Sequence, residues 1–242
     1  MGRDFPITMT LEPIAKIVSP FNEKFGIPRQ ASLIQQANGQ IIFSRPYDNP
    51  DAFIGLEGFS HLWIQFLFHR NIRDAFKPTV RPPRLGGNAK LGVFATRSSF
   101  RPNGLGLSLV KLHEILTKDN STSLLISCPD LLDGTPVFDI KPYVGYSDQP
   151  DNPVCGFANE APQSRLSVEF TSVAARQLEQ HPTPELCKNL KLFLEEMIGL
   201  DPRPAYQKND GDRLYGAQVF DLEVKWRVIN NASALIESIQ KV

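Results

Sequence analysis

The chain has 242 residues, of which 41% are hydrophobic and 21% are charged, and its 26 basic residues balance its 26 acidic residues. This composition is ordinary for a soluble globular protein, and a chain of this length can bury a substantial core. No apolar stretch approaches the roughly 18 residues that a membrane span requires, and the N-terminus lacks the apolar run of a secretory signal, so we expect a cytoplasmic protein with no membrane partner. Three widely spaced cysteines and four histidines without metal-ligand spacing argue against a disulfide framework and against a metal site.

Short segments with alternating apolar and polar residues dominate the first two thirds of the chain, and this pattern predicts β-strands. The predicted strands cover residues 14–18, 40–43, 61–68, 91–95, 107–115, 124–128 and 137–143. Because they are short, closely spaced and separated by turn residues, we expect a mainly β fold in which an antiparallel sheet closes into a barrel.

Residues 147–163 contain three prolines and few large apolar residues, which is typical of a linker. We therefore expect two domains, a barrel at residues 1–163 and a smaller α+β domain at residues 164–242. The second domain contains predicted strands at 166–170 and 220–228 and a short predicted helix at 172–180. A longer helix is expected from the N-cap Thr183 to Gly199. No GxGxxG motif follows a strand, so a doubly wound nucleotide-binding fold has little support.

The segment 96-TRSSFRPNGLGLS-108 carries the densest set of polar groups. Arg97 and Arg101 lie four residues apart, next to a predicted turn at 102–104. A guanidinium can form two parallel hydrogen bonds to a carboxylate or phosphate, and Gly104 and Gly106 allow a ligand to approach the backbone closely. The segment therefore predicts an anion site, with an ordinary hairpin connection as the alternative.

The segment 129-PDLLDGTPVFDIKPY-143 contains a predicted turn at Asp133-Gly134, after which the chain enters a strand. Asp139, Lys141 and Tyr143 share one face of that strand, so they need either solvent or a binding partner. The residues alone favour a hairpin in which Asp139 and Lys141 pair in solvent.

Three shorter features also carry polar side chains. Pro28 stiffens the loop 26-GIPRQ-30, for which a surface turn is the alternative, and His69 lies where a predicted strand leaves the core, a position more often structural than catalytic. After the longer predicted helix, 201-DPRPAYQ-207 offers Tyr206 for stacking on a base and Arg203 for a phosphate, with a proline-stiffened helix exit as the alternative.

The basic residues are unevenly distributed along the chain. Between Arg70 and Lys111 there are nine basic residues and one acidic residue, so this stretch carries eight positive charges and the remainder carries eight negative charges. Such an asymmetry suits a polyanion bound on one face, and a solvated basic loop is the alternative.

Taken in order, these segments resemble the TsaA-like or TrmO family of tRNA (adenine-37 N6) methyltransferases. The resemblance covers nearly the whole chain, although family members often carry proline where this sequence has Ser99. It rests on 26-GIPRQ-30, 57-EGFSHLW-63, 81-RPPRLGG-87, 94-FATRSSFRPNGLGLS-108, 133-DGTPVFDIKPY-143, 201-DPRPAY-206 and 224-VKWRV-228. It implies a single-sheeted barrel, a homodimer, and S-adenosylmethionine bound in the N-terminal domain.

The resemblance also implies which residues bind this cofactor. In this sequence they are Pro28, Arg29, Gln30, His69, Arg70, Arg101, Asp133, Gly134, Thr135 and Pro136. We expect Arg101 to hold the methionine carboxylate and the backbone of residues 133–135 to bind the adenine or the ribose.

The implied reaction methylates N6 of N6-threonylcarbamoyladenosine at position 37 of a threonine tRNA. The enzyme must chiefly align the nucleophile with the methyl group, and a base must remove a proton. We expect Asp139 and Tyr143 as the catalytic residues, and Arg97, Arg203 and Tyr206 as ligands of the substrate. The basic stretch would then hold the anticodon arm of the tRNA.

The alternative function is a non-catalytic RNA-binding module built on a barrel. Such a module needs exposed aromatic residues among its basic ones. Residues 70–111 offer only Phe76, Phe94 and Phe100, and Phe94 falls within the apolar strand predicted at 91–95. We therefore favour the enzyme.

Overall fold

The computed structural model describes residues 8–72, 75–86, 89–160, 166–203 and 213–242. Six strands form a closed barrel in the order β1-β2-β7-β6-β3-β8, and all neighbouring strands are antiparallel. Their bounds are β1 Ala15–Val18, β2 Asn38–Phe43, β3 His61–Leu67, β6 Leu105–Lys118, β7 Ser121–Ser127 and β8 Pro136–Pro142. The prediction of a single-sheeted antiparallel barrel is confirmed.

Strand β3 shows why these segments form a barrel. Leu62, Ile64 and Phe66 are buried in its core, whereas Trp63 and Gln65 alternate with them on the outer face. Each large apolar side chain buried in this way contributes roughly 1.5–3 kcal/mol. Period-two alternation in the sequence therefore becomes one filled interior and one outer surface.

The strand predicted at 91–95 is only partly correct. Strand β5, Leu91–Gly92, pairs with β4, Thr79–Val80, in a two-stranded ribbon. The chain then enters a 3₁₀ turn, η4 Val93–Ala95, in which the Thr96 amide donates to the Val93 carbonyl. Val93 is buried and Phe94 is exposed, so the expectation that Phe94 lies in an apolar strand is wrong.

Short helical segments connect the barrel strands. They are η1 Pro50–Phe53, η2 Leu56–Gly58, η3 Pro83–Leu85, η5 Pro102–Gly104, α1 Gly145–Asp148 and η6 Gly156–Ala158. Five of these six segments begin at a proline or a glycine, which is consistent with tight local turns that no sheet pairing extends.

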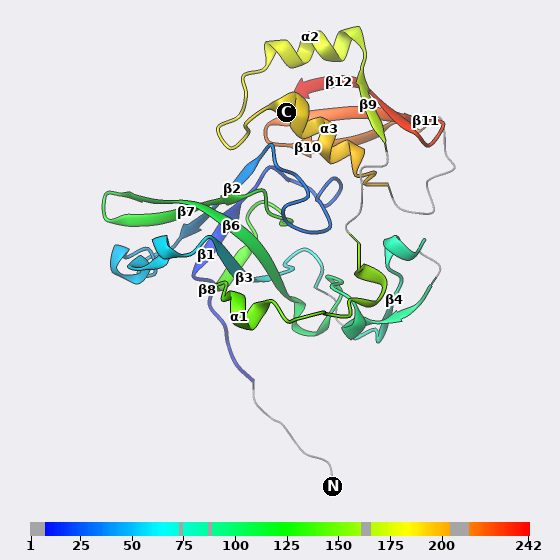
Figure 1. The fold of residues 1–242 in the computed structure, drawn as a ribbon. Helices are drawn as coiled ribbons and strands as arrows, with labels where there is room; N and C mark the ends of the chain where they lie inside the picture. The colour runs from blue at the N-terminus through cyan, green and yellow to red at the C-terminus, as the bar shows by residue number, and fades with distance from the viewer. Residues whose placement is uncertain (1–7, 73–74, 87–88, 161–165, 204–212) are drawn as a thin grey trace.

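The C-terminal region is a four-stranded sheet in the order β10-β11-β12-β9, with β9 parallel to β12. Helices α2 and α3 pack against this sheet, and its core includes the fully buried Trp226 and Phe193 (Figure 1). The bounds are β9 Ser167–Phe170, α2 Ser172–Gln180, α3 Leu190–Gly199, β10 Tyr215–Val219, β11 Leu222–Ile229 and β12 Ser233–Lys241. The expected α+β character of this region is confirmed.

Helix α3 begins later than predicted. Its N-cap is Asn189, whose side chain accepts a hydrogen bond from the Leu192 amide at 3.0 Å. Thr183 is not the cap because the residues just before the helix pair with the barrel region. Cys187 forms a bridge with Ala37, and the Lys188 amide donates to the Gln36 carbonyl.

A second contact joins the two regions after β1. Phe21 forms a bridge with Val219 and is fully buried among the C-terminal core residues. The predicted boundary near residue 163 lies outside the described residues, and the division into 1–163 and 164–242 stays a proposal. In the part of the chain that is described, no helix is long and apolar enough to cross a membrane.

Candidate functional site

The barrel topology gathers the predicted cofactor segments at one end. Leu67 at the end of β3 pairs with Leu105 at the start of β6, and Phe66 pairs with Val137 at the start of β8. Lys16 in β1 pairs with Pro136, so the chain leaving β1 toward loop 26–30 emerges beside β8. His69-Arg70, the Arg101 loop and the 133–136 turn therefore lie around the same opening.

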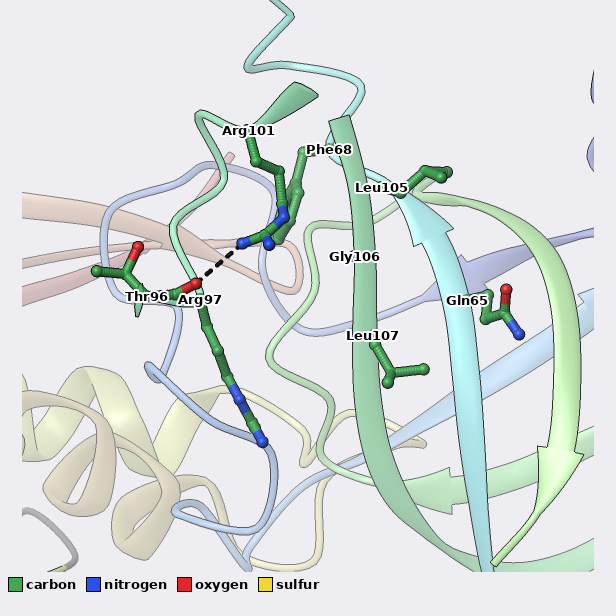
Figure 2. Close-up of a pocket in the computed structure, with 8 residues that line it drawn as sticks. All are labelled: Gln65, Phe68, Thr96, Arg97, Arg101, Leu105, Gly106 and Leu107. Carbon is green, nitrogen blue, oxygen red and sulfur yellow. Dashed lines mark hydrogen bonds between the residues drawn. The ribbon is translucent and has the colours of Figure 1, made fainter. Parts of the chain in front are cut away.

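A cavity of about 530 Å³ lies at this end, which is within the usual size range of small-molecule sites. Its lining combines two guanidinium groups with apolar side chains. The lining residues are Gln65, Phe68, Thr96, Arg97, Arg101, Leu105, Gly106 and Leu107 (Figure 2). The cavity can therefore hold a ligand with an anionic part and an apolar part.

Arg101 is fixed by the tight loop that carries it. Asn103 and Gly104 both have φ of 61°, and the Gly104 amide donates to the Arg101 carbonyl at 3.1 Å. Nη1 of Arg101 donates to the Thr96 carbonyl at 3.0 Å and more weakly to the Ser98 carbonyl at 3.5 Å. A guanidinium has five N–H donors and both bonds use Nη1, so Arg101 can still bind a carboxylate.

Arg97 connects this loop to the 26–30 loop. Its Nη1 donates to Oε1 of Gln30 at 2.5 Å, which brings a predicted substrate ligand and a predicted cofactor ligand together. In Figure 2 the Arg101 side chain folds back toward Thr96 beside Phe68, whereas the Arg97 side chain extends away from that contact. Both arginines line the same cavity, although their side chains point in different directions. In the 26–30 loop, Pro28 is buried and Arg29 is exposed.

Gly106 lines the cavity with its backbone, and its missing side chain makes room for a neighbouring ring. A Cβ atom on Gly106 would lie 2.3 Å from Cζ of Phe66, its partner across the strand pair. Glycine is therefore required on the Phe66 side of the backbone, and the expectation that a ligand approaches Gly106 stays a prediction. At Gly104 the positive φ itself favours glycine.

The turn at 133–136 braces the barrel. The amides of Asp133, Gly134 and Thr135 donate to the carbonyls of Phe21, Ile17 and Leu132 at 2.8, 2.9 and 3.2 Å. The Asp133 side chain also accepts from the Ser19 amide at 3.0 Å. The expectation that this backbone binds the adenine or ribose is therefore wrong for its N–H groups, because all three already donate within the protein.

A hydrogen-bond network ties the His69-Arg70 segment to two other loops. Lys24 donates from Nζ to the Arg70 carbonyl at 2.6 Å and to the side chain of Asn71. Nδ2 of Asn71 donates to Oγ of Ser99 at 2.6 Å. Burial and the neighbouring Arg70 charge lower the pKa of His69, so its imidazole is neutral at pH 7.

The two predicted catalytic residues lie at different distances from the cavity. Asp139 pairs in register with Gln65, which lines the cavity, and its carboxylate is 3.4 Å from Nζ of Lys141. Tyr143 lies opposite His61, four residues from Gln65 along β3, which is about 13 Å. Only Asp139 is therefore close to the cavity.

Arg203 is part of the C-terminal core. Its side chain is 2% exposed, and it donates to Asp201 at 2.7 and 3.3 Å and to Asn231 at 3.2 Å. A guanidinium held in this way cannot reach a substrate, so Arg203 is corrected from a substrate ligand to a structural residue. Tyr206 lies outside the described residues.

Asp130 is a site feature that the sequence analysis missed. It accepts a hydrogen bond at 2.5 Å from Ser108, which is 3% exposed and follows the cavity residue Leu107. Burial raises the pKa of Asp130, while the Ser108 hydrogen bond and the Arg97 charge lower it. The sequence signal that could have identified this pair is the hydroxyl of Ser108 at an inward-facing position of β6. The sequence analysis also missed four residues that line the cavity, because apolar and amide side chains in or next to strands carry no distinctive pattern. They are Gln65, Phe68, Leu105 and Leu107.

Within the described ranges, no group of three or more histidine, cysteine, aspartate or glutamate side chains is placed to hold a metal ion.

Family models match both parts of the chain. The model for the tRNA-methyltransferase O N-terminal domain matches residues 16–149, and that for the TrmO C-terminal domain matches residues 163–242. A tRNA (adenine(37)-N6)-methyltransferase of Escherichia coli K12 is 45% identical over 222 residues, covering 90% of this chain and 92% of that protein. A putative S-adenosylmethionine-dependent methyltransferase of Pseudomonas aeruginosa is 45% identical over 220 residues, covering 91% and 93%.

A solved structure extends the similarity to the fold. The crystal structure of TrmO from Pseudomonas aeruginosa superposes with a TM-score of 0.79 at 35% identity and covers 99% of this chain and 100% of that one. Both parts of the chain match family models, and full-length relatives share almost half of its residues. The chain therefore belongs to the tRNA-methyltransferase O family.

Proposed function

We propose that this protein transfers a methyl group from S-adenosylmethionine to N6 of N6-threonylcarbamoyladenosine at position 37 of threonine tRNA. Family membership supports a methyltransferase that acts on adenine 37 of tRNA, since relatives from Escherichia coli and mouse carry that name. The structural observation that carries the proposal is the cavity at the barrel end, where two guanidinium groups face an apolar lining.

The lining fits the chemistry of this cofactor. S-adenosylmethionine has a carboxylate, which matches a guanidinium, and an adenine ring, which matches apolar side chains such as Phe68 and Leu107. We assign the carboxylate to Arg101 and retain Gln30, which is held by Arg97, as a cofactor ligand. His69 and Arg70 complete the rim of the same opening.

The protein groups must position N6 and remove its proton. When bound, the cofactor supplies an electrophilic methyl group on a positively charged sulfur. The residues of this chain would have to hold N6 in line with that methyl group and accept the proton that N6 gives up. Asp139, beside Gln65 and 3.4 Å from the Lys141 ammonium, is the better placed of the two predicted proton acceptors.

The substrate carries further negative charge. The threonyl carboxylate of the modified base needs a cation, and we propose Arg97, which lies in the same cavity as Arg101. The basic stretch from Arg70 to Lys111 would hold the phosphates of the anticodon arm, and this binding should weaken as salt rises. We retain Tyr206 as a base-stacking candidate, and propose a homodimer working in the cytoplasm.

The decisive experiment compares two forms of the same tRNA. Purified protein should transfer a labelled methyl group to threonine tRNA that bears threonylcarbamoyladenosine and not to the unmodified transcript. A matched transcript with the adenosine at position 37 changed to guanosine is the control for position. Equal labelling of modified and unmodified tRNA would contradict the proposed substrate, and no labelling of either would contradict the activity.

A second measurement separates the enzyme from a non-catalytic RNA-binding barrel. A cofactor that binds the native state stabilises it, so S-adenosylmethionine should raise the thermal midpoint in proportion to the logarithm of its concentration. No shift at saturating cofactor would favour the module.

A further inference from the structure

Two phenylalanine rings stack on each other in solvent within the basic stretch. Phe76 is 58% exposed and Phe94 is 75% exposed, and their ring centroids are 6.4 Å apart with an interplanar angle of 26°. Single exposed apolar residues are common on protein surfaces, but two exposed rings in contact form one larger apolar surface that a partner can cover.

The backbone holds this pair in place. The β4–β5 ribbon pairs Thr79 with Gly92, and the Val93 amide donates to the Pro78 carbonyl at 2.9 Å. Val93 is 1% exposed and anchors the η4 turn, which directs the next residue, Phe94, to the surface. The rings are therefore presented by a fixed ribbon and turn.

The backbone of Phe94 is close to the cavity along the chain. Phe94 is two residues before Thr96, which lines the cavity, and two residues span at most about 7 Å. A group stacked on Phe94 would be a neighbour of whatever occupies the space between Arg97 and Arg101.

The surrounding charge is entirely basic in this part of the sequence. Residues 75–111 contain no aspartate or glutamate, and Lys77, Arg81, Lys90 and Arg97 are exposed. Aromatic rings interleaved with exposed cations are the combination that binds single-stranded nucleic acid, because bases stack on the rings while cations contact the phosphates. An apolar protein partner would use the rings but not the cations.

We infer that Phe76 and Phe94 form a stacking platform for an unpaired base of the tRNA anticodon loop, adjacent to the adenosine that is methylated. This inference rests on the proposed function and identifies the part of the tRNA that this surface binds. Duplex RNA hides the faces of its bases, so the platform selects the loop and not the stem.

The test measures tRNA affinity directly, without methyl transfer. Phe94→Ala and Phe76→Ala should each weaken tRNA binding by roughly 5- to 100-fold, with unchanged affinity for S-adenosylmethionine measured by calorimetry. Phe94→Trp should retain binding and Phe94→Leu should not, because stacking needs a ring. Phe59→Ala is the matched control, since Phe59 is 39% exposed and lies just before β3, whereas the cavity is at the other end of that strand.

Salt dependence distinguishes the platform from the cations around it. Phe94→Ala should weaken binding by the same factor at every salt concentration, whereas Lys77→Ala should reduce the slope of log affinity against log salt by about 1. The β4–β5 ribbon and the 50–58 segment lie on opposite sides of the barrel (Figure 1), so Ile54→Ala, also highly exposed, should change neither affinity nor slope.

Three results would overturn the inference. Wild-type tRNA affinity in both alanine variants would show that nothing stacks on the rings. A loss of affinity that accompanies a change in sedimentation coefficient would show that this face joins two copies of the chain. If the unchanged protein neither binds nor methylates tRNA, the proposed function fails as well, whereas unchanged tRNA affinity in both alanine variants, with normal methylation by the unchanged protein, removes the platform alone.

Discussion

The barrel end and the C-terminal region both use arginine to fix a loop, but the acceptors differ. In the C-terminal region Arg203 and Asp201 form an ion pair in which the two side chains are 2% and 4% exposed. At the barrel end Arg97 donates to an amide oxygen and Arg101 to backbone carbonyls. The buried Asp201 carboxylate neutralises Arg203, whereas the hydrogen-bond acceptors of Arg97 and Arg101 are uncharged, although the Arg97 charge also acts on the nearby Asp130.

This difference separates a structural arginine from a binding one. A guanidinium is always charged at physiological pH, so what decides its role is whether a carboxylate of the protein already balances it. By that criterion the motif 201-DPRPAY-206 contributes its arginine to folding, and the segment 96–108 contributes its arginines to the site. Substitution of Arg203 changes only the C-terminal region, and substitution of Arg101, Arg97 or Ser99 changes only the barrel end.

The largest effect is expected from Arg203→Ala. Removing one partner of a buried ion pair leaves Asp201 charged and uncompensated, which typically costs about 3–5 kcal/mol of folding free energy. We expect a large fall in the thermal midpoint. Affinity for S-adenosylmethionine, extrapolated to temperatures where the variant is folded, should change little.

Lys241→Ala is the control for this prediction. It breaks the exposed pair between Lys241 and Asp221, whose side chains are 71% and 56% exposed, and should cost less than about 1 kcal/mol. If Arg203→Ala folds normally and loses only tRNA methylation, Arg203 is a substrate ligand. That result would contradict the distinction between a structural Arg203 and the binding arginines at the barrel end.

An intermediate effect is expected from Arg101→Ala. Losing a charge-assisted hydrogen bond to a carboxylate costs about 1.5–3 kcal/mol, so affinity for S-adenosylmethionine should fall roughly 10- to 150-fold by calorimetry. The folding free energy should stay nearly unchanged because the acceptors of Arg101 are backbone carbonyls near the surface. Arg101→Lys should recover only part of the affinity, since an ammonium cannot form the two parallel bonds.

Arg97→Ala sharpens the assignment within the cavity. It should retain most of the cofactor affinity and lose selectivity for the modified tRNA. The opposite pattern in the two variants would exchange the roles of Arg97 and Arg101.

The sequence predicted the barrel because its signal is local. Alternation in 61–68 correctly identified β3, and the turn at Asp133-Gly134 correctly preceded β8. What it could not predict depends on partners far along the chain. Arg203 is buried partly because Asn231 accepts from it, and helix α3 starts at Asn189 because the preceding residues bond to the 36–37 loop. Phe94 was placed in a strand because an apolar run does not reveal that the chain leaves the strand conformation at Val93 and enters the 3₁₀ turn η4.

The candidate site was predicted in part. Polar residues on loops, such as Gln30 and Arg101, stand out in a sequence, and the topology brings their segments together. Leu107 and Gln65 do not stand out, since a cavity wall on a strand looks like any other outward face. The packing reason for Gly106 could not be predicted, because Phe66, the ring that fills the space of its missing side chain, lies forty residues earlier.

The smallest effect is expected from Ser99→Ala, which tests whether neutral hydrogen bonds hold the barrel-end loops. Oγ of Ser99 accepts from Nδ2 of Asn71 at 2.6 Å, and Asn71 is also bonded to Lys24, so this contact joins three loops around the cavity. Its loss should cost about 0.5–1.5 kcal/mol of folding free energy and weaken cofactor binding only slightly.

A double-mutant cycle isolates that contact. Ser99→Ala should have almost no further effect in an Asn71→Ala background, because the hydrogen bond is already gone, and the difference between the two backgrounds is the coupling energy. A Ser99→Pro variant also lacks the hydroxyl, so it should behave like Ser99→Ala. A coupling energy near zero would mean that the loops are held by backbone contacts alone. The contrast with the C-terminal region would then concern only the arginines, and not the way in which each region orders its loops.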